Sequence, residues 1–261
     1  MIAALRYEWV RVSTIRATRL LLGFTLVLSA LLAWLIANPH TAFDDAGNET
    51  GVAIIDWWTA FSAPLTITAV LASVVASQAI GQEYRFGLIR LTLTAFPNRV
   101  QILVAKLVVV VGAAVVFAVV SFLGSEIGAA VRGYPLPPAG VTAPDSTYLL
   151  RGVVFVALWA LASFGLAGVT RQTGIGIAVP ILSGLVVEQL LMALLSDRVG
   201  WLVTILPWSS AGRWSQDPAT EAVGSVFGLT LPVGWAALGV FTVWVVAFLA
   251  VETVAFLRRD A

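Results

Sequence analysis

Cysteine is absent from this 261-residue chain, and the residues that commonly supply catalytic or metal-binding groups are scarce. Without cysteine there can be no disulfide, no thiol nucleophile and no iron–sulfur ligand set. The single histidine, His40, excludes a paired-histidine zinc site within one chain. The only lysine, Lys106, follows an alanine, so the Gly-Lys step of a P-loop is missing. We therefore expect no catalytic residue, no metal site and no bound cofactor in this chain.

Charge is equally sparse. Charged residues make up 11% of the chain and hydrophobic residues 59%, with a mean hydropathy of +0.95, whereas an average soluble domain is about 25% charged. A chain this apolar has too few polar groups to cover its core in water, and we therefore expect its solvent to be lipid. The net charge of +1 gives no basis for binding nucleic acid. These numbers predict an all-α, polytopic integral membrane protein.

Six apolar stretches are near the roughly 20 residues that a membrane-spanning helix needs. The apolar run of the first is longer than the core of a secretory signal, so we expect it to be retained. The expected spans are residues 20–37, 57–80, 102–131, 148–170, 174–195 and 231–257.

The distribution of positive charge predicts the orientation of these spans. With the N-terminus in the cytoplasm, most of the 15 Lys and Arg residues fall on the cytoplasmic side. The outer side keeps only Arg132, Arg151, Arg198 and Arg213. We therefore expect a multi-pass protein of the plasma or inner membrane with both termini in the cytoplasm.

Two further segments are too short or too polar to span the bilayer. Residues 1–19 are expected to form an interfacial helix, because Ile2, Leu5, Trp9 and Val12 share one stripe among arginines. The segment at about 199–214 is apolar, is interrupted by a proline and contains three tryptophans, which favour a membrane interface. We predict a re-entrant or surface-lying segment on the outer face, within a six-helix transmembrane domain that covers residues 20–261.

A short charged segment at about 83–95 separates the second and third expected spans. If it is helical, Glu83, Gly87, Arg90 and Thr94 fall on one face, with apolar stripes on both sides of that face. Apolar stripes on two sides suit a protein cleft better than a lipid surface. By spacing alone, a solvated loop helix anchored by positive charge remains an equal alternative.

This segment, "EYRFGLIRLTLTAFPNRVQILVAK", resembles the first cytoplasmic loop of ABC transporter permeases of the type-2 exporter family. The N-terminal "LRYEWVRVSTIRATR" is also similar to the start of those proteins, although Leu88 stands where the family usually has threonine. The likeness covers essentially the whole chain. The matching positions in the loop are Glu83, Arg85, Gly87, Arg90, Leu93, Pro97, Arg99 and Lys106.

The resemblance implies a function for the segment. In that family the loop is a coupling helix, which docks into a cleft of a separate ATPase. It implies that this chain is a permease subunit of an ATP-driven exporter, with ATP and Mg²⁺ held by two partner ATPase subunits. A second copy or a related permease would complete the substrate path. The residues that it marks for coupling are Glu83, Arg85, Gly87, Arg90, Pro97 and Arg99.

Ionisable groups at membrane depth are a second set of candidates, because burying charge in lipid is costly. Glu188 and Gln189 lie deep in the fifth expected span, and Glu126 and Arg151 lie near the outer ends of the third and fourth. One interpretation is a structural pair in which Arg151 bridges one or both acids. The other places Glu188 in a substrate cavity.

Three other classes of protein are weighed against a transporter. An enzyme is disfavoured because the chain has no Gly-x-Ser-x-Gly elbow and no pair of aspartates within its spans. A channel is disfavoured because no charged ring or repeated pore loop is present. A non-transporting anchor, or an immunity-type module that sequesters a peptide or drug, remains the alternative.

Overall fold

The computed structural model describes residues 1–37, 40–43, 49–53, 57–96, 98–133, 146–195, 199–215, 225–226, 229–230 and 232–258. Helices dominate this part of the chain, with two short antiparallel hairpins between them. The hairpins pair β1 (His40–Phe43) with β2 (Glu49–Ala53), and β3 (Ser225–Val226) with β4 (Leu229–Thr230). The helices are α1 Ile2–Thr14, α2 Arg16–Ile36, α3 Trp57–Ser62, α4 Leu65–Arg85, α5 Ile89–Ala95, α6 Arg99–Val131, α7 Ser146–Thr170, α8 Thr173–Leu182, the π-helical turn η1 Ser183–Val187, α9 Glu188–Leu195, α10 Gly200–Thr204, α11 Pro207–Trp214 and α12 Gly234–Arg258.

The six expected spans are confirmed as helices that are long and apolar enough to cross a membrane. Their ends differ from the sequence estimate by a few residues, because the helices continue past the apolar runs into charged turns. In the described residues, these helices cover Arg16–Ile36, Ala60–Arg85, Arg99–Val131, Leu149–Thr170, Thr173–Leu195 and Gly234–Arg258.

Two helix pairs have the most extensive packing in the bundle: α4 packs along α7, and the more peripheral α2 packs along α6. The α2–α6 contact is close because Gly124 and Gly128, four positions apart on α6, face the backbone of α2. A methyl group on Gly128 would lie 1.9 Å from the carbonyl oxygen of Ala30. Gly224 and Gly228, which share this spacing, lie outside the described residues.

Proline and backbone geometry divide three of the long helical stretches. Pro64 stands at the junction of α3 and α4, and Pro180 lies in α8 shortly before η1; proline cannot donate the regular helical hydrogen bond at either position. Ile15, with φ −64° and ψ 124°, separates α1 from α2, so the N-terminal helix ends at Thr14 rather than near residue 19. The hinge allows α1 to leave the direction of α2 and to pack against α6.

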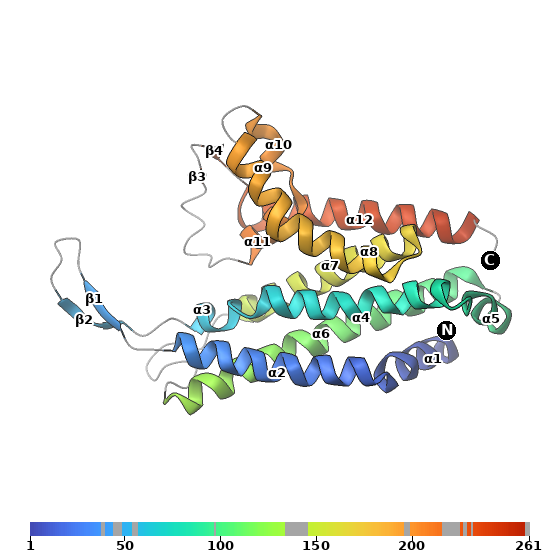
Figure 1. Cartoon of the computed structure of the whole chain (residues 1–261), viewed down its shortest axis with the longest axis horizontal. Coiled ribbons are helices and arrows are strands. Elements are labelled where there is room, and N and C mark those ends of the chain that lie inside the picture. Colours follow the sequence, from blue (N-terminus) through green and yellow to red (C-terminus); the bar gives the residue numbers. More distant parts are fainter. Residues whose placement is uncertain are drawn as a thin grey trace.

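The elements sort to opposite ends of the bundle (Figure 1). The N-terminal helix α1, the short helix α5 and the last turns of α12 lie at one end, which we call the α5 end. The β1–β2 hairpin extends from the opposite end. Segments far apart in sequence therefore meet at the α5 end.

Candidate functional site

The segment expected to be one continuous coupling helix is in fact two helices. In the structure α4 ends at Arg85, a turn covers 86–88, and α5 begins at Ile89. Gly87 makes this turn with φ +67°, a left-handed conformation that favours glycine. The expectation that Glu83, Gly87, Arg90 and Thr94 share one helical face is therefore wrong, because Gly87 breaks the helix.

This break divides the predicted coupling residues between the interior and the surface. Glu83 is 1% exposed, whereas Arg85, Gly87 and Arg90 are all exposed. Arg99 donates from Nη1 to the carbonyl oxygen of Leu257, 3.3 Å away, and so joins α6 to the end of α12. Pro97 lies outside the described residues.

Exposed apolar side chains surround the turn. Phe86, Leu88 and Leu91 are 63%, 45% and 66% exposed, while Ile89 is 6% exposed. We call the exposed set Phe86, Leu88, Arg90 and Leu91 the α5 surface. Exposed apolar patches mark contacts with another protein or with a membrane.

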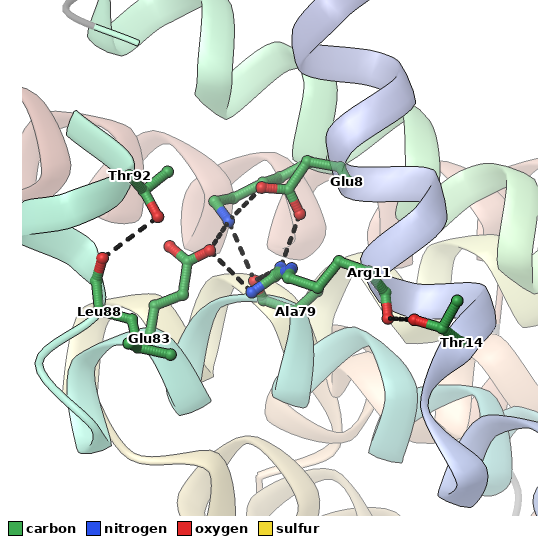
Figure 2. Close-up of polar contacts among 8 residues, drawn as sticks. Glu8, Arg11, Thr14, Ala79, Glu83, Leu88 and Thr92 are labelled. Carbon is green, nitrogen blue, oxygen red and sulfur yellow. Dashed lines mark hydrogen bonds and ion pairs between the residues drawn. The ribbon is translucent and has the colours of Figure 1, made fainter. Parts of the chain in front are cut away.

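Beneath the α5 surface lies a buried network of charges, shown in Figure 2, which we call the ion-pair cluster: Glu8, Arg11, Glu83 and Lys106. Lys106 is fully buried, and its Nζ donates to Oε1 of Glu8 at 2.7 Å and to Oε1 of Glu83 at 2.6 Å. Arg11 donates to the other Glu8 oxygen at 2.6 Å and to Oε1 of Glu83 at 2.7 Å. Two acids and two bases therefore neutralise one another.

The cluster joins three helices through one backbone position. Ala79, one turn before Glu83 on α4, accepts hydrogen bonds at its carbonyl oxygen from both Lys106 and Arg11. The Glu8 and Arg11 side chains come from α1, and Lys106 comes from α6. The ends of α1, α4 and α6 are therefore tied directly below the α5 surface.

Sequence reasoning missed most of this cluster. The sequence marks Lys106 only as a position that matches the family's loop, and it predicts an α1 stripe of Ile2, Leu5, Trp9 and Val12. Instead Ala4, Glu8 and Val12 form the buried face, and Ile2 is 84% exposed. The available signal was a single lysine inside a strongly apolar run, which requires a nearby counter-charge.

The second candidate set, the ionisable and polar residues at membrane depth, does not form one site. Glu188 is 2% exposed, and its carboxylate caps α11. It accepts from the backbone N–H of Trp208 at 3.1 Å and of Ser209 at 2.6 Å, and from the Ser209 hydroxyl at 2.7 Å. A carboxylate at these first N–H groups satisfies donors that no helical carbonyl reaches, and it matches the positive end of the helix dipole.

The predicted bridge from Arg151 to Glu188 is therefore wrong. The Arg151 guanidinium lies over the ring of Trp214, 4.6 Å from its centre, and the Glu188 carboxylate accepts instead from Trp208 and Ser209. Gln189 donates to the carbonyl oxygen of Gly184 at 3.5 Å. A pairing between Glu126 and Arg151 stays a prediction.

The segment predicted at 199–214 forms the two short helices α10 and α11. Only one of its tryptophans is placed as an interface residue would be: Trp201 is 67% exposed, whereas Trp208 and Trp214 are 4% and 2% exposed. Trp208 packs against Trp159 and Phe241, so it belongs to the core. The segment is held to the bundle by these rings and by Glu188.

The fold defines a multi-pass membrane protein, with a surface turn anchored at the α5 end. Residues 15–187 match the model of the family described as ABC-2 family transporter protein, and the chain belongs to this family. It is therefore the membrane component of an ABC transporter. A comparison with curated proteins found no match. The matched stretch includes Glu83 and Lys106 and ends one residue before Glu188.

The turn at Gly87 gives a direct test of the local geometry. Gly87→Ala is expected to destabilise the turn by about 1 kcal/mol, because the added Cβ meets no neighbouring atom and only the left-handed backbone is strained. The measurement is the thermal unfolding midpoint of the purified protein in detergent. Gly174→Ala is the matched control, since its Cβ also meets nothing and its φ is not left-handed. Equal midpoints for the two variants would contradict the assigned turn.

Proposed function

We propose that this chain is the permease subunit of an ATP-driven exporter, in which two separate ATPase subunits dock on the α5 surface. The observation that carries the proposal is the exposed apolar turn around Phe86 and Leu91, fixed above the buried ion-pair cluster. A second permease copy, or a related permease, would face this one across the substrate path. The substrate would be moved outward across the plasma or inner membrane.

Lipid does not account for the α5 surface. Arg85 ends the second candidate span and Arg99 begins the third, so the turn and α5 lie between spans. Exposed Leu91 and Phe86 would face water there if nothing covered them. Arg90 lies beside the apolar Leu91, and Phe86 is nearby in the turn. Aromatic and arginine side chains are enriched in protein–protein interfaces.

The ion-pair cluster supplies a route from that surface into the bundle. A partner that pushes the 86–88 turn moves the end of α4, and Glu83 holds that end to Arg11 and Lys106. In the proposed cycle, closure of the ATPases on ATP would displace α1, α4 and α6 together. Both chain termini would then lie in the cytoplasm with the ATPases, in agreement with the arginines near the N-terminus.

The α10–α11 segment is proposed to act as the outer gate. It lies at the far end of the α8–η1–α9 stretch, and Glu188 connects it to that stretch. A π-helical turn such as η1 is frequent at functional sites and interrupts the regular ladder of a helix. Movement of this stretch would carry α11 with it.

The docking proposal predicts different outcomes at the surface and in the interior. Leu91→Asp and Arg90→Glu should each reduce co-purification of a P-loop ATPase at least tenfold, because both change the centre of the α5 surface. Glu83→Gln should retain the ATPase but uncouple its ATP hydrolysis from transport, since Glu83 is 1% exposed and cannot touch a partner. The measurements are the ATPase-to-permease ratio after affinity purification and transport per ATP hydrolysed.

The control is Leu31→Asn, which changes a leucine that is 48% exposed on α2, away from the α5 surface. It should leave the ratio unchanged. A wild-type protein that purifies from its own membranes without any P-loop ATPase, or Leu91→Asp with an undiminished ratio, would contradict the proposal. The first outcome would favour an anchor or sequestering module.

A further inference from the structure

A small cavity lies inside the elbow between α1 and α2. Its volume is about 160 Å³, and α6 closes its inner side. Trp9 and Val12 of α1, Leu22 of α2 and Phe117 of α6 give it largely apolar walls. Val12 and Phe117 are 4% and 1% exposed, so the inner wall is part of the packed core.

Three polar side chains also line this elbow pocket, and one of them, the exposed Ser13, donates its hydroxyl to the carbonyl oxygen of Val10 at 3.3 Å. Thr18 is 5% exposed, and its hydroxyl has no hydrogen-bond partner among the residues that the structure describes. Arg19, at the rim, is exposed and has one guanidinium nitrogen 3.1 Å from the carbonyl oxygen of Thr14. The hydroxyl oxygen is itself covered in this structure. A buried hydroxyl without a partner is costly in an apolar wall, so rotation of the Thr18 side chain toward a ligand oxygen in the pocket would be stabilising.

The position of the pocket relative to the bilayer narrows the class of ligand. The first candidate span begins at Arg16, so Thr18 and Arg19 lie within the first turn of a membrane-crossing helix. Arginines at that position are at the level of the lipid headgroups. Leu22 and Phe117 lie deeper, where acyl chains are found.

We propose that the elbow pocket binds one anionic phospholipid. The Arg19 guanidinium pairs with the lipid phosphate, the Thr18 hydroxyl donates a hydrogen bond to a phosphate or ester oxygen, and the first methylenes of an acyl chain fill the space between Trp9 and Phe117. The charge on Arg19 selects an anionic headgroup, and the apolar walls select a chain over a free anion. This proposal does not depend on the α5 surface or on an ATPase.

The test uses the full-length protein purified in a neutral detergent, with binding of dioleoyl-phosphatidylglycerol measured by native mass spectrometry. Thr18→Val, which keeps the shape of the side chain and removes only the unpartnered hydroxyl, should weaken binding several-fold without lowering the unfolding midpoint. Arg19→Gln should weaken it about fivefold, which corresponds to about 1 kcal/mol for one cation near an anionic lipid. Ala113→Leu, which fills the pocket, should abolish the tightest binding event.

Arg16→Gln is the matched control. It removes the same charge three positions earlier on the same helix, from an exposed side chain that does not line the pocket. Equal losses for Arg16→Gln and Arg19→Gln would reduce the effect to general surface charge and overturn the proposal. Equal binding of dioleoyl-phosphatidylcholine, competition by inorganic phosphate, or unchanged binding in Thr18→Val would overturn it as well.

Discussion

Lys106→Met is expected to lower the free energy of unfolding by about 3–5 kcal/mol, the usual cost of removing one partner from a buried ion pair. The substitution keeps the length of the side chain, but among the described residues it leaves Arg11 as the one cation paired with the carboxylates of Glu8 and Glu83. Both acids are at most 1% exposed, so water cannot replace the lost ammonium. The measurement is unfolding in mixed detergent, or the thermal midpoint in a lipid-like detergent.

Arg90→Met serves as the comparison for this loss, because it deletes an exposed cation of the short helix α5 and should change stability little. Adding Glu83→Gln to Lys106→Met restores the charge balance and should recover part of the stability. A midpoint for Lys106→Met equal to that of Arg90→Met would contradict the buried cluster. Failure of the second substitution to recover any stability would show that packing, rather than charge, dominates there.

Glu188→Ala is expected to destabilise the protein by about 3 kcal/mol, because hydrogen bonds to a charged group contribute about 1.5–3 kcal/mol and several are lost together. The N–H groups of Trp208 and Ser209 would be left buried without their acceptor, and Arg213 would lose a nearby negative charge. Hydrogen exchange of α11, measured by mass spectrometry, should rise before that of the α4–α7 core.

Glu188→Gln should give an intermediate loss, since the amide keeps one acceptor oxygen for α11 but removes the charge. Gln189→Ala, at the neighbouring exposed position, should leave the exchange of α11 unchanged. If Glu188→Gln instead altered ATPase stimulation while α11 exchange stayed at the wild-type rate, a cavity role for Glu188 would be favoured over the capping role. If α11 exchanged its amide hydrogens at the same rate in all three variants, the capping role of Glu188 would be contradicted.

The long apolar runs predicted the fold well. A helix that crosses lipid must make all its backbone hydrogen bonds within its own segment, so a continuous apolar stretch of sequence is enough to identify it. The position of the α5 segment was also predicted, by charge interrupting those runs. Its internal geometry was not, because a glycine can continue a helix or end it, and residue spacing alone does not distinguish the two outcomes. The prediction that Trp208 lies at the membrane interface was wrong for a related reason, since a tryptophan ring suits either a membrane interface or a core.

The partners of the buried charged residues could not be predicted, because they are far apart along the chain. Lys106 pairs with Glu8, 98 positions away in the sequence, and with Glu83, 23 positions away, and no local residue spacing predicts such pairs. Glu188 and Ser209 are 21 positions apart, and the intervening chain turns back on itself before they meet. A helical period predicts which side chains share a face, but it does not predict which other helix that face will contact.

The unequal lengths of α2 and α6 have a consequence for the membrane in which this protein works. At 21 residues α2 is about 31 Å long, which matches the thickness of an ordinary hydrocarbon layer, whereas the 33 residues of α6 exceed it. Leu26 and Ala30 lie beside Gly124 and Gly128, so the excess of α6 falls at the end where it meets α1. A thicker bilayer would draw that end, with its buried lysine, toward the acyl chains. Reconstitution in lipids of increasing chain length should therefore reveal an upper limit of thickness beyond which the protein loses stability.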